Sequence, residues 1–327
     1  MSIVFLSDSP EWCQPLADVL RDNFGVSAVI LDTAAVLPTF EPSLASGSLS
    51  MFLGRECKVL VNRMSSRPKG DTAALTTLFR SIMDSMSLYT MGQKPPLVIN
   101  GHHCHRIGAS KVMQASLLAA VGARTPRTVV VTRLSLQSTL LRLLQESSTS
   151  GEELIDWLLK PNVGGKGVGI RAVGPGCVLP KMDDLADTFD PDGVAVLQQV
   201  VSTADGMVHR VELVNFKPLY TAHVSITPES NFNSCLSDVC TRTKKSRILV
   251  DAPVFSEENS KSILAMCSII AEACQMQLGS VEYLIDKEGH PWFIDINPVS
   301  TVLQDAEAVL GEGALTLQAR WLASILS

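Results

Sequence analysis

One glycine-dense segment constrains the fold more than any other part of the sequence. In residues 158–170, LLKPNVGGKGVGI, four glycines and two lysines fall within thirteen positions. The segment that follows is rich in β-type residues and has no helical stripe, so the glycines join strand to strand. Glycines let backbone N–H groups approach a ligand closely, and the lysines indicate that this ligand is an anion. The sequence therefore predicts a hairpin that folds over a phosphate.

Two other phosphate-binding loops do not match this segment. A P-loop requires Gly-x-x-x-x-Gly-Lys-Ser/Thr before a helix, whereas Lys166 is followed here by Gly167. A dinucleotide fingerprint requires Gly-x-Gly-x-x-Gly at the start of a helix, whereas the spacing here is Gly-x-Gly-x-Gly. The alternative to a phosphate-binding hairpin is a mobile surface hairpin that has no ligand.

Length, charge and cysteine content narrow the class of protein. The 327 residues suit two or three domains, and the net charge of −6 argues against a general nucleic-acid binder. The 8 cysteines form no Cys-x-x-Cys pair, and the N-terminal apolar run covers only residues 3–6. No apolar stretch approaches the ~20 residues of a membrane span. We expect a soluble cytoplasmic protein without nucleic-acid or membrane partners, and a homo-oligomer is left open.

The first part of the chain alternates strand and helix patterns. Strands are predicted at 3–6, 26–31, 58–62 and 95–100, and helices at 11–25 and 71–92. This alternation is typical of a small, doubly wound parallel sheet.

The rest of the chain is richer in strands. Helices are predicted at 110–122, 134–148, 256–277 and 312–326, and strands at 127–131, 153–160, 167–173, 194–201, 207–214, 219–226, 279–286 and 291–297. Ser110 is the predicted N-cap of the first of these helices.

A second informative segment, residues 279–298, sets acidic residues opposite each other. If residues 287–290 form a hairpin loop, Glu282 lies opposite Asp295, and Asn297 lies on the same face. Two adjacent acids repel unless a cation lies between them, and such oxygen ligands suit Mg²⁺. The alternative is an exposed polar strand face, which fits the apolar neighbours of Glu282 less well.

Together the two segments resemble the ATP-grasp superfamily, and RimK-type ligases in particular, over roughly residues 95–300. The hinge strand of that family, Leu-Gln-Glu-hydrophobic, is matched by LQQVV at residues 197–201. The other matching features are a lysine that begins a helix, a strand lysine before the glycine hairpin, a strand arginine, and an acid followed on the next strand by an acid-x-Asn pair. These are Lys111, Lys160, Arg210, Glu282, Asp295 and Asn297.

The resemblance implies an α/β and α+β chain with the ATP-grasp fold. A Rossmann-like pre-ATP-grasp domain would occupy residues 1–105. A central lobe with the glycine-rich hairpin would follow at residues 106–198, and a C-terminal lobe with the metal site at residues 199–327.

The resemblance also implies roles for individual residues. The expected ATP-binding residues are Lys111, Lys160, Gly164, Gly165, Lys166, Gly167, Gln198, Gln199, Val200, Val201 and, at the ribose, Asp205. The expected ligands of Mg²⁺, or of Mn²⁺ in its place, are Glu282, Asp295 and Asn297. The expected catalytic residues, near the phosphates and an anionic substrate, are Arg210, Arg242 and Arg247.

The activity implied by the resemblance is ATP-dependent ligation of a carboxylate to an amine. ATP phosphorylates the carboxylate to an acyl phosphate, and the amine then attacks to give an amide, ADP and phosphate. The carboxylate belongs to a small molecule or a peptide, and the amine to a substrate such as an amino acid. The alternatives are a small-molecule kinase with the same nucleotide site and a nucleotide-binding regulator without turnover.

Three positions depart from the family pattern. The two metal acids occur in the order Glu282 then Asp295, the reverse of the usual order, and the hinge carries Gln199 where glutamate is common. The segment after Asn297 reads PVSTV rather than a Pro-x-Pro-Gly loop.

A histidine-rich segment, NGHHCHRIG at residues 100–108, superficially resembles a metal site. Consecutive residues cannot all converge on one ion, so a structural zinc site is disfavoured. We expect a loop between two domains near the nucleotide cleft.

Overall fold

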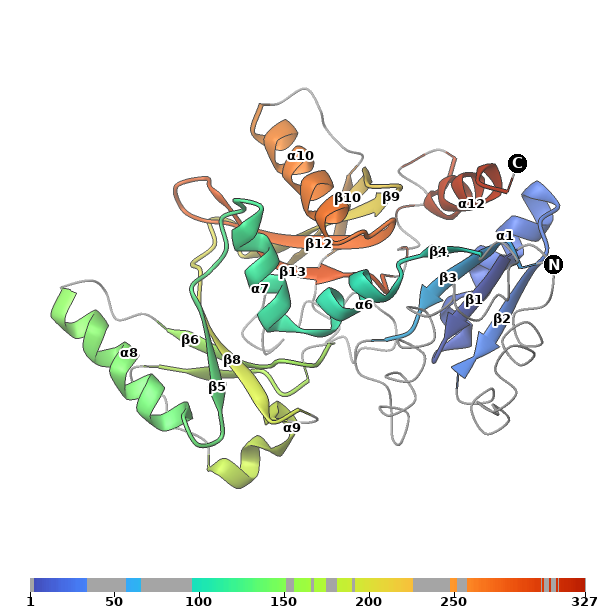
Figure 1. Cartoon of the computed structure of the whole chain (residues 1–327). Coiled ribbons are helices and arrows are strands. Elements are labelled where there is room, and N and C mark those ends of the chain that lie inside the picture. The colour runs from blue at the N-terminus through green and yellow to red at the C-terminus, as the bar shows by residue number, and fades with distance from the viewer. Residues whose placement is uncertain are drawn as a thin grey trace, which may run out of the picture.

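The computed structural model arranges its described residues in three β-sheets (Figure 1). These residues are 3–33, 57–65, 96–150, 156–165, 168–174, 181–189, 192–225, 248–251, 258–300, 302, 306, 310 and 312–326. Of the helices within these ranges, none is both long and apolar enough to cross a lipid bilayer.

The N-terminal sheet is parallel, as the alternating sequence pattern predicts. Its strands are β1 (Ile3–Ser7), β2 (Ala28–Asp32), β3 (Val59–Arg63) and β4 (Leu97–Ile99), in the order β2-β1-β3-β4. After a short 3-10 turn, η1 (Pro10–Trp12), helix α1 (Gln14–Phe24) ends at Gly25, whose φ of 64° suits a glycine cap. The helix predicted at residues 71–92 lies outside the described residues.

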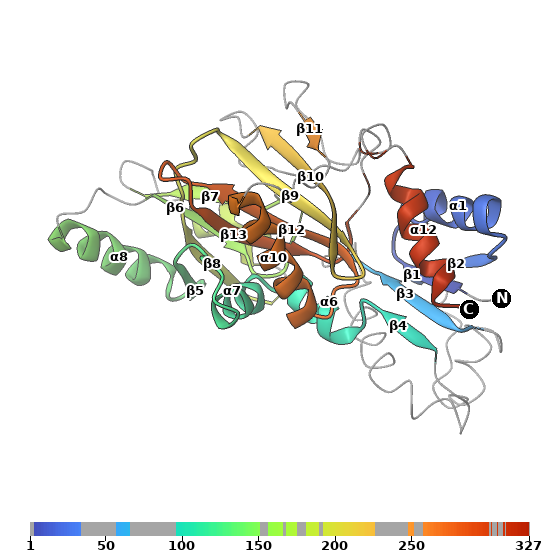
Figure 2. The same ribbon diagram turned by 90° about the horizontal axis from the view of Figure 1, so that it is seen from above.

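The last helix of the chain returns to this N-terminal sheet. Helix α12 (Ala314–Ser324) packs beside α1, and the two helices lie side by side in both views (Figure 1, Figure 2). Ala319 and Leu322 of α12 share a buried core with Ile3 and Phe5 of β1. The C-terminal helix therefore completes the hydrophobic core of the first sheet.

The central sheet is antiparallel. Its strands are β5 (Thr128–Thr132), β6 (Trp157–Pro161), β7 (Arg171–Val173) and β8 (Val194–Gln199), in the order β5-β8-β6-β7. Its core also takes in α8 (Leu136–Ser150), η4 (Met182–Leu185) and α9 (Ala186–Phe189). The prediction of a strand over residues 167–173 is too long, because Gly169 has a φ of 77° and lies in a turn before β7.

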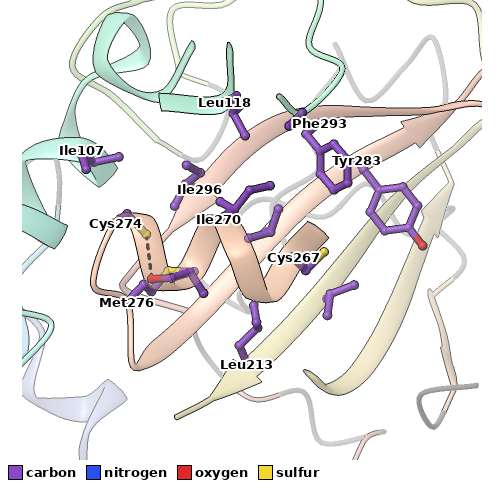
Figure 3. Packing of buried hydrophobic residues seen from close by; sticks show 14 of the residues in the cluster. Ile107, Leu118, Leu213, Cys267, Ile270, Cys274, Met276, Tyr283, Phe293 and Ile296 are labelled. Atoms are coloured by element: carbon purple, nitrogen blue, oxygen red, sulfur yellow. Dashed lines mark hydrogen bonds between the residues drawn. The ribbon is translucent and has the colours of Figure 1, made fainter. Parts of the chain in front are cut away.

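The C-terminal sheet has five strands. They are β9 (Met207–Val214), β10 (Lys217–Ser225), β11 (Ile248–Asp251), β12 (Leu278–Ile285) and β13 (Pro291–Asn297), in the order β11-β10-β9-β12-β13. Helices α6 (His102–Ala109), α7 (Lys111–Ala120) and α10 (Glu258–Ala273) contribute to the core on one face of this sheet. Figure 3 shows part of that core, where Ile270 and Cys267 of α10 lie near Ile296, Tyr283 and Leu213 of the strands.

The prediction of a loop in the histidine-rich segment is wrong, because this segment forms α6. The backbone N–H of His105 donates to the carbonyl of Gly101 at 3.0 Å, as in the first turn of a helix. Cys104 and Ile107, three positions apart, point into the core of the C-terminal sheet. Burial of this apolar face explains the helix.

The hairpin of β12 and β13 has a longer loop than the sequence predicts. Ile285 pairs with Pro291, so that residues 286–290 form the loop. Asp286 closes it, because its Oδ1 accepts the backbone N–H groups of Glu288 at 3.0 Å and of His290 at 2.7 Å. This local hydrogen bonding extends the loop back to residue 286.

Candidate active site

The polar face of the C-terminal sheet carries two adjacent rows of functional side chains. One row runs through Arg210, Glu282 and Asp295, and the next through Glu212, Ser280 and Asn297. The predicted pairing of Glu282 with Asp295 is confirmed, because a β-bulge after Glu282 compensates for the longer loop. Val211 and Val281 lie between the two rows in sequence and face the core, so the rows share the opposite face.

The three predicted metal ligands lie together in this arrangement. The amide nitrogen of Asn297 donates to Oε1 of Glu282 at 3.1 Å, and Oδ1 of Asp295 forms an ion pair with Nζ of Lys111. Glu282 is 6% exposed, which excludes a solvated polar strand face. Two carboxylates and a side-chain amide form an oxygen-rich donor set, and this set fits a hard cation such as Mg²⁺.

The two predicted phosphate-binding lysines lie on elements that pack with different sheets: α7 contributes to the core of the C-terminal sheet, and β6 belongs to the central sheet. Lys111 begins α7, whereas Lys160 lies on β6 of the central sheet. The pKa of Lys160 falls to about 8, first because of burial and second because of the positive charge of Lys111. Asp295 and Glu282 oppose this decrease in pKa, so both lysines and both acids share one electrostatic environment.

Sequence reasoning missed Asn162, which links the strand that carries Lys160 to the helix that carries Lys111. It follows Lys160 by two positions, and its backbone carbonyl accepts the N–H of Lys111 at 2.9 Å. Its side-chain Oδ1 accepts the backbone N–H of Val112 at 3.1 Å and the hydroxyl of Ser110 at 2.9 Å. Ser110 is the N-cap of α7, as predicted. Asn162 therefore joins the end of β6 to the first turn of the helix that carries Lys111.

The described ends of the glycine hairpin fold back onto β6. A Cβ atom at Gly169 would lie 2.8 Å from Cγ of Pro161, and its φ of 77° already disfavours other residues. The N–H of Val168 donates to the carbonyl of Gly165 at 3.3 Å, which is consistent with a turn next to Gly164. Lys166 and Gly167 lie outside the described residues, so their phosphate contacts stay a prediction.

The predicted hinge follows directly from β8. The carbonyl oxygen of the Gln198 side chain accepts a hydrogen bond from Nζ of Lys160 at 2.6 Å, which links hinge and phosphate-binding lysine. The backbone N–H groups of Gln199 and Val200 each donate to a neighbouring segment at 2.9 Å. The contacts of Gln198, Gln199, Val200 and Val201 with an adenine ring stay a prediction.

The predicted ribose contact, Asp205, lies beside a histidine pair. Its Oδ2 is 3.0 Å from Nε2 of His209, and Nδ1 of His209 is 2.6 Å from Nδ1 of His223. Burial lowers the pKa of His209, an effect that the charge of Asp205 opposes. His209 stacks on Tyr283 on the side of the sheet that faces α10. The ribose role of Asp205 stays a prediction.

Arg210 belongs to a buried network that sequence reasoning did not identify. Its Nη2 donates to the hydroxyl of Ser300, and that hydroxyl donates to Oε2 of Glu212. Arg63, at the end of β3, donates to the backbone carbonyl of Ser300. Burial raises the pKa of Glu212, whereas Arg210, the Ser300 hydroxyl and Arg63 oppose that rise. The other predicted catalytic residues, Arg242 and Arg247, lie outside the described residues.

Comparison with known proteins gives similarity of fold. No family model and no curated protein matches the sequence. D-cycloserine synthetase DcsG matches with a TM-score of 0.65 and 15% identity, over 100% of both chains. ATP-grasp ligase PsnB, complexed with Mg, ADP and a phosphomimetic variant of its minimal precursor, matches with a TM-score of 0.62 and 14% identity, over 100% of this chain and 98% of PsnB.

A third match is a RimK domain ATP-grasp protein from Sphaerobacter thermophilus. Its TM-score is 0.62 at 13% identity, over 98% of this chain and 99% of that protein. At such identities the likeness concerns the fold, and it extends along the whole chain. The predicted fold class is confirmed: this chain has the ATP-grasp fold.

Proposed function

We propose that this protein is an ATP-dependent, ADP-forming ligase that joins a carboxylate to an amine through an acyl phosphate. Its cofactors are ATP and Mg²⁺, and its substrates are a small-molecule or peptide carboxylate and an amine. The observation that carries this proposal is the cluster in which Lys111 forms an ion pair with Asp295, which lies opposite Glu282 on the neighbouring strand.

Each part of this site has a role in the proposed reaction. Glu282, Asp295 and Asn297 would hold Mg²⁺, which would neutralise charge on the ATP phosphates. Lys111 and Lys160 bind the phosphates, and their positive charges stabilise the transferring phosphoryl group. The hinge at residues 199–201 binds adenine through its backbone.

The ion pair of Lys111 with Asp295 supports this assignment. Without nucleotide, the lysine that binds phosphate neutralises an acid that binds metal, so neither charge is buried without a partner. The structural neighbours give independent support, since one is a ligase complexed with Mg and ADP and another is a synthetase.

A screen for ADP release over carboxylates, with and without amines, tests the proposal. ADP release that requires both substrates supports a ligase, turnover with one substrate indicates a kinase, and nucleotide binding without turnover indicates a regulator. Product mass must show an amide bond, because a carboxylate-dependent ATPase would also release ADP.

Two variants test whether the turnover takes place at the proposed site. Glu282→Gln removes one charge from the metal set and should abolish ADP release. Glu288→Gln is the matched control, because Glu288 lies in the exposed loop of the same hairpin. Equal loss of activity in both variants would argue against the metal site.

A further inference from the structure

The polar side chains around Arg210 form a network that is almost completely buried, unlike an ion pair at the protein surface. Its side chains come from β3, β9, β12 and the segment after β13. They are Arg63 at 8% exposure, Arg210 at 7%, Glu212 at 1%, Ser280 at 0% and Ser300 at 3%. Two guanidinium groups and one carboxylate thus lie together at the edge of the proposed catalytic site.

Three polar atoms of this network have no hydrogen-bond partner among the described residues. They are Nε of Arg210, Oε1 of Glu212 and the hydroxyl of Ser280. Native proteins satisfy nearly all of their buried polar atoms, so three unpartnered atoms in one place call for a specific explanation. One atom is a donor, one is an acceptor, and the hydroxyl can be either.

A purely structural ion pair does not account for this pattern. Nη2 of Arg210 lies 3.6 Å from Oε2 of Glu212, which is too long for a hydrogen bond. The hydroxyl of Ser300 bridges the two side chains. Nε of Arg210 and Oε1 of Glu212 therefore remain for a further partner.

The position of Glu212 identifies which partner that is. In the register of the sheet, Arg210 lies opposite Glu282, and Glu212 lies opposite Ser280. Ser280 in turn lies opposite Asn297. Alternate residues on one strand face lie about 7 Å apart, so the network adjoins the metal ligands. If the carboxylate of a small substrate lies between Arg210 and the metal ligands, the substituents next to that carboxylate lie near Glu212 and Ser280.

We propose that Glu212 is a specificity-determining residue, which selects a carboxylate substrate with a protonated amino group close to the reacting carboxyl group. Nε of Arg210 donates to the substrate carboxylate, while Oε1 of Glu212 and the hydroxyl of Ser280 accept from the ammonium group. The substrate class is thus amino acids, or peptides with a free amino group near the reacting carboxylate. This inference rests on the proposed ligase function.

Binding of matched ligand pairs tests the inference on the full chain. The probes are amino acids and their desamino counterparts, such as glutamate with glutarate and alanine with propionate, measured by calorimetry with Mg²⁺ and a non-hydrolysable ATP analogue. We expect at least one amino acid to bind about tenfold or more tightly than its counterpart, since the hydrogen bond is charge-assisted. Glu212→Gln should reduce that preference to about threefold or less, while nucleotide affinity is unchanged.

Ser280→Ala separates ligand binding from folding. The serine hydroxyl has no partner among the described residues, so its removal should leave the melting temperature unchanged and still weaken amino-acid binding. This variant also keeps the test valid if Glu212→Gln does not fold. Glu288→Gln is the exposed-charge control and should behave like the parent.

Three results would overturn the inference. They are equal binding of amino and desamino probes, an undiminished preference in both variants, and no probe binding by a parent protein that binds the nucleotide analogue. If the parent does not bind the nucleotide analogue, the proposed function fails as well. A preference for amino acids without ADP release would retain the ammonium site and refute the ligase.

Discussion

Nucleotide affinity should fall as the pH rises from 7 to 9 because of Lys160. The pKa of this lysine is about 8 in the free protein, so it is mostly charged at pH 7 and mostly neutral at pH 9. Nucleotide phosphates favour the charged form, so binding at pH 9 must take up a proton. If the bound lysine stays protonated, the dissociation constant should rise about tenfold between these two pH values.

Titration calorimetry at pH 7, 8 and 9 with a non-hydrolysable ATP analogue and Mg²⁺ measures this rise. Lys160→Met keeps most of the length of the side chain and removes the charge, so its nucleotide binding should be weaker at pH 7 and independent of pH. A flat profile in the parent, or the same tenfold rise in Lys160→Met, would refute the assignment of Lys160 to the phosphate site.

The same pKa sets the sign of a stability effect. The pKa of Lys160 is lowered from 10.5 to about 8 on folding, so the unfolded chain binds more protons between these values. The contribution of this lysine to the free energy of unfolding therefore becomes more favourable as the pH rises through that window. The difference in free energy of unfolding between the parent and Lys160→Met should therefore shift in favour of the parent from pH 8 to pH 10 in urea denaturation.

The remaining predictions concern the metal acids, the glycine hairpin and the link between β6 and α7. Asp295→Asn should abolish turnover at limiting Mg²⁺ but change metal-free nucleotide affinity little, and activity close to that of the parent would exclude the metal role. Gly169→Ala should destabilise the protein by about 2–3 kcal/mol in urea denaturation, because it adds a clash to an unfavourable φ. Gly193→Ala is its control, with φ 75° and open space around the added Cβ, and should cost about 1 kcal/mol. Asn162→Ala should cost about 1–2 kcal/mol, because its side-chain oxygen accepts hydrogen bonds from Ser110 and Val112 at the start of α7, and it should weaken nucleotide binding; an affinity equal to that of the parent would contradict its positioning role.

The fold and the central pair of acids could be predicted because both depend on local patterns. Alternating strands and helices indicate the parallel N-terminal sheet, and the period of two along a strand brings Glu282 and Asp295 opposite each other. The predicted pair is right although the predicted loop is wrong. The loop extends back to Asp286, whose side chain accepts backbone N–H groups, and the β-bulge then restores the register.

The histidine-rich helix shows how composition can hide a pattern. The polar run of His102, His103 and His105 favours a loop, whereas the helix depends on the apolar pair Cys104 and Ile107. Their spacing of three was visible in the sequence. It was missed because the short segment has only this one apolar pair.

The network of Arg210 could not be predicted from local sequence. Arg63 and Ser300 are 237 positions apart, and neither lies in a motif. Glu212 stands two positions after Arg210, on the same strand face, which could have indicated a second charge in the site. That the Ser300 hydroxyl binds Oε2 of Glu212 and leaves Oε1 without a partner depends on the tertiary structure, which the local sequence does not reveal.

The return of α12 to the N-terminal sheet has a consequence for synthesis on the ribosome. β1 emerges from the ribosome long before α12, but it shares its core with Ala319 and Leu322, which are translated some three hundred codons later. Until then the nascent chain exposes Ile3 and Phe5, which is the kind of surface that chaperones bind. The N-terminal sheet therefore becomes fully packed only after α12 has been translated. Chaperone depletion should impair the folding of newly made chains more than the refolding of denatured ones.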